Sequence, residues 1–193
     1  MSDTIKILRR EIVSRGFGLL ERVTFWRRKF NGAPREFTRE VYDNGPGATI
    51  LLYDPQRGRI LLVRQFRPAV YLVEGRDSLI ETCAGKLEGA AAADRIVTEV
   101  LEETGFTIER PTYLFSAFMS PGVYAEKISF FIAPYSPQDR IAAGGGLDHE
   151  NEDIEILEPT LDEALDMITR GEIEDAKTIL LIHYAVLHRL LES

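Results

Sequence analysis

Three glutamates, Glu99, Glu102 and Glu103, are the side chains whose type and spacing point most directly to chemistry. They stand at i, i+3 and i+4 in a segment with a helical pattern, about residues 91–104, so a helix would place all three on one face. Like charges at this spacing destabilise an isolated helix, and a cation among them would offset the repulsion. For three glutamates alone, however, a solvated acidic face is the commoner explanation.

The residues that flank this helix favour a metal site. An apolar, strand-like stretch ends at Ala84-Gly85, a glycine-containing loop follows, and Gly105 ends the helix. Hard divalent ions take oxygen ligands, and Mg²⁺ typically uses one or two carboxylates while substrate phosphates and waters fill the other positions. The loop before the helix can bring backbone carbonyls to the same ion. The pattern therefore predicts a site for a hard divalent cation.

Charge and cysteine content limit the classes of protein that fit. The net charge of −8 argues against a long nucleic-acid contact, although a bound metal can still attract a small anion. The single cysteine, Cys83, lies in an apolar run and indicates a reducing compartment. The N-terminal residues contain no secretory signal, and the longest apolar stretch, 179–191, is too short and too polar to span a bilayer. We expect a cytoplasmic protein with no membrane or nucleic-acid partner.

The chain divides at a turn cluster over residues 43–47. Before it, strand-like stretches at 18–27 and 35–42 flank the turn residues 31–34, as in a hairpin. We therefore predict an N-terminal β segment over 1–45 and a larger domain over 46–193. The strand candidates of the larger domain are residues 48–53, 59–66, 78–84, 112–118 and 127–133.

Two further helices are expected near the end of the chain. Thr160 followed by Glu163 is a capping-box pattern, and Gly171 ends the helix that it begins. The second helix is expected from about residue 175 to 191. Strands flanked by helices predict an α/β layered domain.

The acidic helix and its flanks resemble the signature of the Nudix hydrolase family. That signature is a glycine, a loop, a helix that carries Arg-Glu and Glu-Glu, and a closing glycine before an apolar residue. The matching residues are Gly85, Glu99, Glu102, Glu103, Gly105 and Phe106. The resemblance implies an α/β/α sandwich with a mixed sheet, preceded by an antiparallel β segment. It also implies hydrolysis of a diphosphate with Mg²⁺, or alternatively Mn²⁺, as cofactor.

The match to the signature is incomplete. The spacing from Gly85 to Gly105 is one residue shorter than usual, and the expected loop glutamate falls on Ala90 or Ala91. Thr98 stands where the family carries the arginine that orients the glutamates. Our hypothesis is that Arg95, one turn before Glu99, takes over this task.

Further stretches resemble the branch of the family that contains GDP-mannose and ADP-ribose pyrophosphatases, the first of these most. They occur in order over residues 39–43, 47–53, 64–67, 119–122, 144–146, 152–155 and 171–178. The positions that match substrate contacts in this part of the chain are Arg67, Ala84, Gly85, Lys86, Glu126, Asn151, Glu152 and Lys177. Arg67 would reach the phosphates, a task that suits a bidentate cation. By itself, an arginine or lysine of this kind is more often a surface residue.

An acidic loop follows the glycine run 144–146 and is expected to be mobile. Acidic loops are usually solvated, but in this branch the loop supplies a glutamate from outside the signature. Glu152 matches best as metal ligand or base, and Glu150 is the second candidate. The resemblance implies catalytic roles for Glu152, Glu150, Glu103 and Arg67. The implied metal ligands are Ala84 through its carbonyl, Glu99, Glu102, Glu103 and Glu152.

The branch also implies a homodimer in which the N-terminal segment is exchanged and contributes to the partner's substrate pocket. The residues that match those positions are Phe17, Thr38, Arg39 and Glu40. The expected reaction is hydrolysis of a nucleotide sugar, with GDP-mannose giving GMP and mannose 1-phosphate. ADP-ribose is the alternative substrate, and a nucleotide-sugar-binding domain without catalysis is the alternative class. RNA or cap processing is disfavoured by the acidic charge.

Overall fold

The computed structural model describes residues 4–147, 149 and 151–191, and the chain forms two compact units. The small unit comprises the chain up to Pro46 together with Phe118–Lys127. The large unit comprises Gly47–Ala117 and the chain from Ile128 onward.

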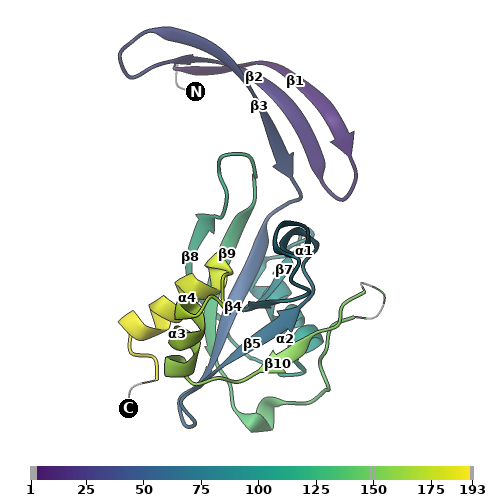
Figure 1. The fold of residues 1–193 in the computed structure, drawn as a ribbon, viewed down its shortest axis with the longest axis vertical. Helices are drawn as coiled ribbons and strands as arrows, with labels where there is room; N and C mark the ends of the chain where they lie inside the picture. Colours follow the sequence, from purple (N-terminus) through teal and green to yellow (C-terminus); the bar gives the residue numbers. More distant parts are fainter. Residues whose placement is uncertain (1–3, 148, 150, 192–193) are drawn as a thin grey trace. The chain divides into compact units, whose positions relative to one another are not determined.

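The small unit is a three-stranded antiparallel sheet in the order β1-β2-β3 (Figure 1). Its strands are β1 (Ile5–Arg15), β2 (Leu19–Arg28) and β3 (Pro34–Asp43). The predicted hairpin of β2 and β3 is confirmed, with an unbroken register from Leu19 opposite Asp43 to Arg28 opposite Pro34. Strand β1 has no counterpart among the strand stretches predicted with bounds, because charged residues and two bulges interrupt its alternation.

The loop 118–127, which the sequence analysis assigned to the larger domain, packs with this sheet. The N–H of Tyr42 donates to the Val123 carbonyl at 2.8 Å, and the Tyr42 and Tyr124 rings stack at 5.8 Å between centroids. These contacts hold the loop to the end of β3.

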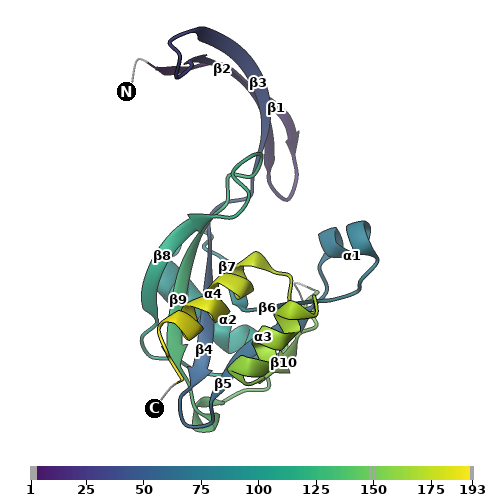
Figure 2. The ribbon, with the colours of Figure 1, turned by 60° about the vertical axis from the view of Figure 1, so that its left-hand side comes forward.

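The large unit is built on a mixed seven-stranded sheet (Figure 2). The path is β10-β5-β4-β9-β8, and β6 and β7 pair with β5 and β4 respectively. The central pair, β4 and β9, is parallel, whereas β4 runs antiparallel to β5 and β7. The strands are β4 (Gly47–Asp54), β5 (Arg59–Gln65), β6 (Leu79–Glu81), β7 (Cys83–Lys86), β8 (Thr112–Phe118), β9 (Lys127–Pro134) and β10 (Glu155–Leu157).

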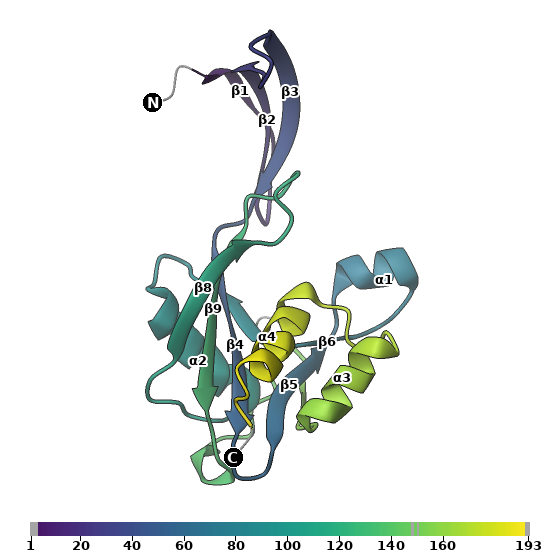
Figure 3. The same cartoon turned by 90° about the vertical axis from the view of Figure 1, so that its left-hand side faces the viewer.

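Helices cover both faces of this sheet. Figure 3 shows α2 (Ala92–Thr104) on one face, with α3 (Leu161–Thr169) and α4 (Ala176–Leu187) on the other. On the α2 side, Ile50 and Leu52 share a buried cluster with Ile96 and Val100. Because both faces of β4 are covered, it is an almost continuous apolar run, as buried strands are. The predicted α/β/α sandwich with an N-terminal antiparallel segment is confirmed.

Several elements differ from the expectation. The strand expected over 78–84 is two strands, because Thr82 leaves the ladder and its N–H donates to the Thr178 hydroxyl at 2.7 Å. The short helix α1 (Pro68–Glu74) was missed; it buries no side chain and projects from the large unit (Figure 3). The strand β10 and the 3₁₀ turn Pro137–Asp139 were also missed, since three residues give no periodicity.

Helix ends follow the capping rules. The capping box of α3 is present as predicted, with Glu163 N–H donating to the Thr160 hydroxyl at 3.2 Å. Gly105 ends α2 at a φ of 74°, and a Cβ there would lie 2.2 Å from the Ala142 carbonyl oxygen. The last helix is shorter than expected, because Arg189 takes a positive φ of 51° beyond it.

Within the part of the chain that is described, no helix has the length and apolarity that crossing a membrane requires.

A partly buried ion-pair network at the turn between β4 and β5 yields a stability prediction. Asp54, 1% exposed, accepts from the Arg57 guanidinium, which also binds Glu158 at 2.5 Å. Burial opposes ionisation of Asp54, but the Arg57 and backbone hydrogen bonds bring its pKa below the ordinary value.

Arg57→Ala leaves the Asp54 carboxylate without its cation and should lower the unfolding free energy by about 3 kcal/mol in urea titrations. Arg9→Ala, which breaks an exposed pair with Glu11, is the control, and an equal loss there would contradict the assignment.

Candidate active site

The helix α2 brings the three predicted glutamates together on one face. Glu99 and Glu103 are buried, with 6% and 2% of their surface exposed, and Glu102 is half-buried. The backbone of β7 lies against this face, since a Cβ at Gly85 would lie 1.5 Å from a carboxylate oxygen of Glu99. A side chain at this position would displace the Glu99 carboxylate from its place against β7. The spacing on α2 therefore positions carboxylates next to β7, which carries the predicted site residues Ala84, Gly85 and Lys86.

Glu103 is the most deeply placed of these carboxylates. Burial raises its pKa to about 8; a hydrogen bond from the Cys83 thiol and the Arg67 charge oppose the shift, whereas Glu99 and Glu152 add to it. Its Oε2 is buried and has no hydrogen-bond partner among the described residues. The hydrogen bonds and cations around Glu103 therefore do not fully offset the cost of burying its negative charge.

Arg95 lies where the hypothesis for it requires. Its Nη2 is 2.7 Å from Glu99 Oε1 and its Nη1 is 3.7 Å from Glu102 Oε2. Its Nε donates to the Lys86 carbonyl at 3.2 Å. One guanidinium thus connects two glutamates with the end of β7, a geometry that can orient both carboxylates in place of the arginine that Thr98 replaces.

The glycine run binds the C-terminal end of α2. The N–H groups of Gly145 and Gly146 donate to the carbonyls of Glu103 and Glu102 at 2.8 and 3.1 Å. At Gly144, with a φ of 70°, a Cβ would lie 2.5 Å from the Thr104 carbonyl carbon. These glycines were predicted to give a mobile loop and to match the pyrophosphatase branch, and the structure adds that they cap the carboxylate helix through close backbone contact.

Beyond the glycines, Glu152 folds back within its loop. Its Oε2 accepts a hydrogen bond from Leu147 N–H at 3.0 Å. Its charge acts on both Cys83 and Glu103, so this carboxylate is electrostatically coupled to the α2 site. Asn151, beside it, is exposed with a φ of 57°. Glu150, the second candidate base, lies outside the described residues.

Arg67 and Lys177, two predicted substrate contacts, meet at a residue that the sequence analysis did not select. Arg67 Nε donates to Glu81 Oε2 at 2.5 Å, and Lys177 Nζ lies 3.3 Å from Glu81 Oε1. Burial disfavours the charged form of Arg67, but the negative charge of Glu81 more than offsets this effect. The pKa of Arg67 is therefore raised, and the charge of Glu103 adds to the rise. The only sequence signal for Glu81 was an acidic residue inside an apolar run.

The remaining predicted substrate residues belong to the small unit. Phe17 is 84% exposed, the Thr38 hydroxyl pairs with that of Thr24 at 3.0 Å, and Glu40 binds Arg22 at 2.8 Å. Two more residues complete the set, Arg39 and Glu126. For this group the structure gives the local contacts of the sheet and its loop, and their role at the site stays a prediction.

The donor atoms of the large unit fit a hard divalent cation. Among the described residues, no three acidic, histidine or cysteine side chains already converge as a complete metal site. The buried Oε2 atoms of Glu102 and Glu103 nevertheless have no hydrogen-bond partner there, and buried polar atoms of this kind call for an ion or water. All the candidate ligands are oxygen atoms, which Mg²⁺ and similar ions prefer.

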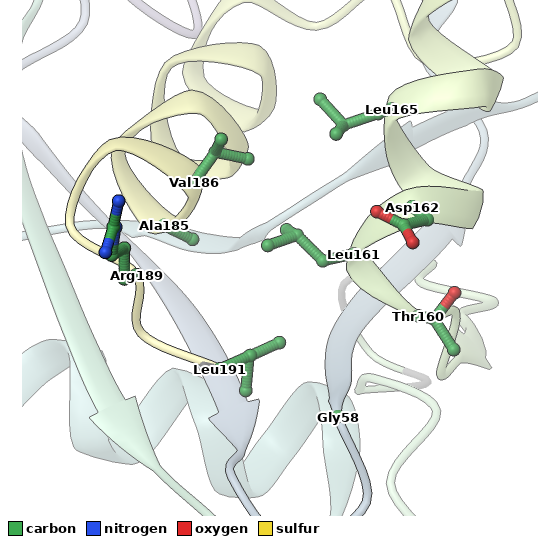
Figure 4. Close-up of a pocket in the computed structure, with 9 residues that line it drawn as sticks. All are labelled: Gly58, Thr160, Leu161, Asp162, Leu165, Ala185, Val186, Arg189 and Leu191. Atoms are coloured by element: carbon green, nitrogen blue, oxygen red, sulfur yellow. The ribbon is translucent and has the colours of Figure 1, made fainter. Parts of the chain in front are cut away.

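A separate cavity of about 390 Å³ lies between α3 and α4 (Figure 4). Leu161, Leu165 and Val186 line it, and Asp162 and Arg189 supply its charged groups. It shares no lining residue with the predicted site. We therefore do not assign chemistry to it.

Known proteins resemble this chain over its whole length, although no family model matches it. A GDP-mannose pyrophosphatase of Citrobacter koseri is 45% identical over 186 residues, which cover 95% of this chain and 96% of that protein. One of Escherichia coli O157:H7 is 43% identical over 194 residues and one of Salmonella paratyphi B is 42% identical over 193 residues, each with 100% coverage of both chains.

The fold also matches a solved structure, described as that of an ADP compounds hydrolase. The TM-score is 0.74 at 19% sequence identity, with 97% of this chain and 95% of the other covered. This likeness concerns the fold alone. The full-length identity to the pyrophosphatases, together with an acidic helix of the Nudix type, shows that the chain belongs to the GDP-mannose pyrophosphatase family of Nudix hydrolases.

Proposed function

We propose that this protein hydrolyses the diphosphate bond of a nucleotide sugar, with GDP-mannose as first candidate and GMP and mannose 1-phosphate as products. The observation that carries the proposal is the coupling of two kinds of charge: buried glutamates on α2, and the Arg67–Lys177 pair, whose Arg67 is acted on by the charge of Glu103. A diphosphate needs both a cation and positively charged side chains around it. The names of the relatives support the choice of substrate.

Nudix hydrolases generally use a divalent metal, and we propose Mg²⁺, with Mn²⁺ as the alternative. The residues that would hold it are the Ala84 carbonyl, Glu99, Glu103 and Glu152, with Glu102 as a further ligand. Such an ion supplies positive charge that neutralises the diphosphate oxygens and favours attack by water. Because Glu103 has a raised pKa, the chain must release its proton before this carboxylate can serve as ligand.

The protein side chains then orient the substrate and accept a proton. Arg67 uses Nε for Glu81, so its two terminal amino groups can be directed at phosphate oxygens. Glu152, with Glu150 as the alternative, would position the attacking water and take its proton. Water oxygen bonds to one phosphorus while the bridging oxygen leaves with the other phosphate. Arg67 would stabilise the charge that develops on the phosphoryl group.

We further propose that the active form is a homodimer with exchanged N-terminal segments, to which Phe17, Thr38, Arg39 and Glu40 contribute substrate contacts. The small unit supports this, because it exposes apolar side chains that an isolated sheet would leave in water. They include Ile5, Ile7, Leu8, Ile12 and Phe17, each at least half exposed. A monomer with full activity at micromolar concentration would contradict the proposal.

Two alternative functions would use the same site, one with a different substrate and one without hydrolysis. An ADP-ribose pyrophosphatase would use the same chemistry, and the name of the structural neighbour fits it. A nucleotide-sugar-binding domain without catalysis is favoured by Thr98 and by the alanines at 90 and 91. The contacts of Arg95 with Glu99 and Glu102 favour catalysis, since they supply an orienting arginine.

The function is tested with purified protein on a panel of GDP-mannose, ADP-ribose, other nucleotide sugars and capped RNA. We expect Mg²⁺-dependent release of GMP and mannose 1-phosphate, with GDP-mannose giving the highest kcat/KM, and loss of turnover when EDTA is added. Calorimetric titration with the same compounds detects binding without turnover. Binding without cleavage would support the non-catalytic alternative. A protein that neither binds nor cleaves any of these compounds would refute both the enzyme and the binding-domain hypotheses.

The role of Arg95 gives a second prediction. Arg95→Ala should lower kcat/KM by about 10- to 100-fold, the usual effect of removing a residue that orients ligand side chains. It should also raise the Mg²⁺ concentration needed for half-maximal activity. Arg110→Ala removes an exposed arginine beyond the helix and is the matched control. Unchanged activity and Mg²⁺ dependence in Arg95→Ala would show that another residue orients the glutamates.

A further inference from the structure

We propose that Glu81 is a positioning residue that holds Arg67 and Lys177 side by side for the diphosphate of the substrate. The inference rests on the proposed function and assigns a task to a side chain that does not itself touch the reacting atoms. Neither the signature of the family nor the spacing of the glutamates on α2 includes Glu81. It is the last residue of β6, whereas the signature residues begin on β7 and continue on α2.

The contacts of Glu81 use both of its carboxylate oxygens. Oε2 accepts from Arg67 Nε at 2.5 Å, and Oε1 lies 3.3 Å from Lys177 Nζ. The carboxylate is 3% exposed, and a charge removed from water to this degree requires paired cations. The two cations come from distant parts of the chain, the N-cap of α1 and the first turn of α4. Glu81 is the group that connects them.

A second set of contacts fixes Lys177 from the other side. Asp175, the N-cap of α4, accepts from Thr178 N–H at 2.9 Å and lies 2.6 Å from Lys177 Nζ. The Thr178 hydroxyl in turn accepts the N–H of Thr82 at 2.7 Å, the residue next to Glu81. The first turn of α4 is thus tied to the same strand end that carries Glu81. Lys177 has little freedom to leave its position over this carboxylate.

Electrostatics explains why an anion is needed between the two cations. The positive charge of Arg67 acts unfavourably on that of Lys177, so the pair would separate if nothing lay between them. Glu81 and Asp175 offset this repulsion before the substrate arrives. The charge of Glu103 also acts on Arg67, so the cation pair is electrostatically coupled to the carboxylate site. A diphosphate entering there meets cations that are already oriented.

Two substitutions separate charge from shape at this position. Glu81→Gln keeps the size of the side chain but removes its charge, and Glu81→Asp keeps the charge on a chain one methylene shorter. A matched control is Glu155→Gln, which breaks an exposed pair with Arg64 at 2.6 Å on the neighbouring strand. Thermal melts of each variant show the temperature below which all of them are folded.

The decisive measurement is a double-mutant cycle in kcat/KM for GDP-mannose with Mg²⁺. In the native background, Glu81→Gln should lower kcat/KM by about 100-fold, the scale expected when binding groups are misplaced. In the Arg67→Ala background the same substitution should cost less than about 10-fold, because one of the two groups that it positions is gone. Should Glu81→Gln fail to fold, Glu81→Asp enters the cycle in its place, with an expected loss of about 10-fold. Glu155→Gln should change kcat/KM by less than about twofold.

A purely structural role for Glu81 gives a different result. It would lower the melting temperature but leave kcat/KM of the folded variant near the native value, or reduce it by the same factor in both backgrounds. Either result overturns the proposal. If the native protein cleaves no nucleotide sugar, the proposed function fails and this inference fails with it. An active native protein with an unaffected Glu81→Gln variant refutes the positioning role alone.

Discussion

The cost of burying negative charge is the constraint on which this structure depends. Glu99 and Glu103 leave water on the inner side of α2, on the same helix whose Ile96 and Val100 enter the core. Burial and mutual repulsion oppose their charged forms, and the raised pKa of Glu103, about 8, expresses that cost. Apolar side chains at these two positions would avoid the cost of burying charge and would give a more stable fold. Carboxylates retained at such positions are typical of sites that bind a cation or perform chemistry.

Cations of the protein offset part of this cost from two directions. On one side Arg95 joins two glutamates to the carbonyl of Lys86. On the other side Arg67 and Lys177 meet at Glu81, and in the proposed function they would contact the phosphates of the substrate. Neither group neutralises Glu103 fully. The large unit therefore combines an excess of negative charge on α2 with a separate pair of cations at Glu81. Close backbone contacts of the glycines hold the carboxylate helix in place.

Local patterns in the sequence predicted much of this arrangement. The three glutamates share a face because helix periodicity alone decides it, and the α3 capping box and the β2–β3 hairpin were likewise readable from neighbouring residues. The resemblance to Nudix hydrolases supplied the loop and the substrate residues, which periodicity could not. Glu81 was missed because its partners lie 14 and 96 positions away in sequence. The capping of α2 by Gly145 and Gly146 was missed for the same reason, since tertiary contact alone creates it.

The most direct test of the account is a calorimetric titration of Mg²⁺ into the native protein and into Glu103→Gln at pH 7, in buffers of different ionisation enthalpy. With its pKa raised to about 8, Glu103 is largely protonated at that pH, so binding of Mg²⁺ to the native protein should release a proton. Glu103→Gln should bind Mg²⁺ more than about 100-fold more weakly, release no such proton and lose turnover to a similar degree. Equal Mg²⁺ affinity and equal turnover in the two proteins would contradict the claim that the buried carboxylates of α2 hold the catalytic cation.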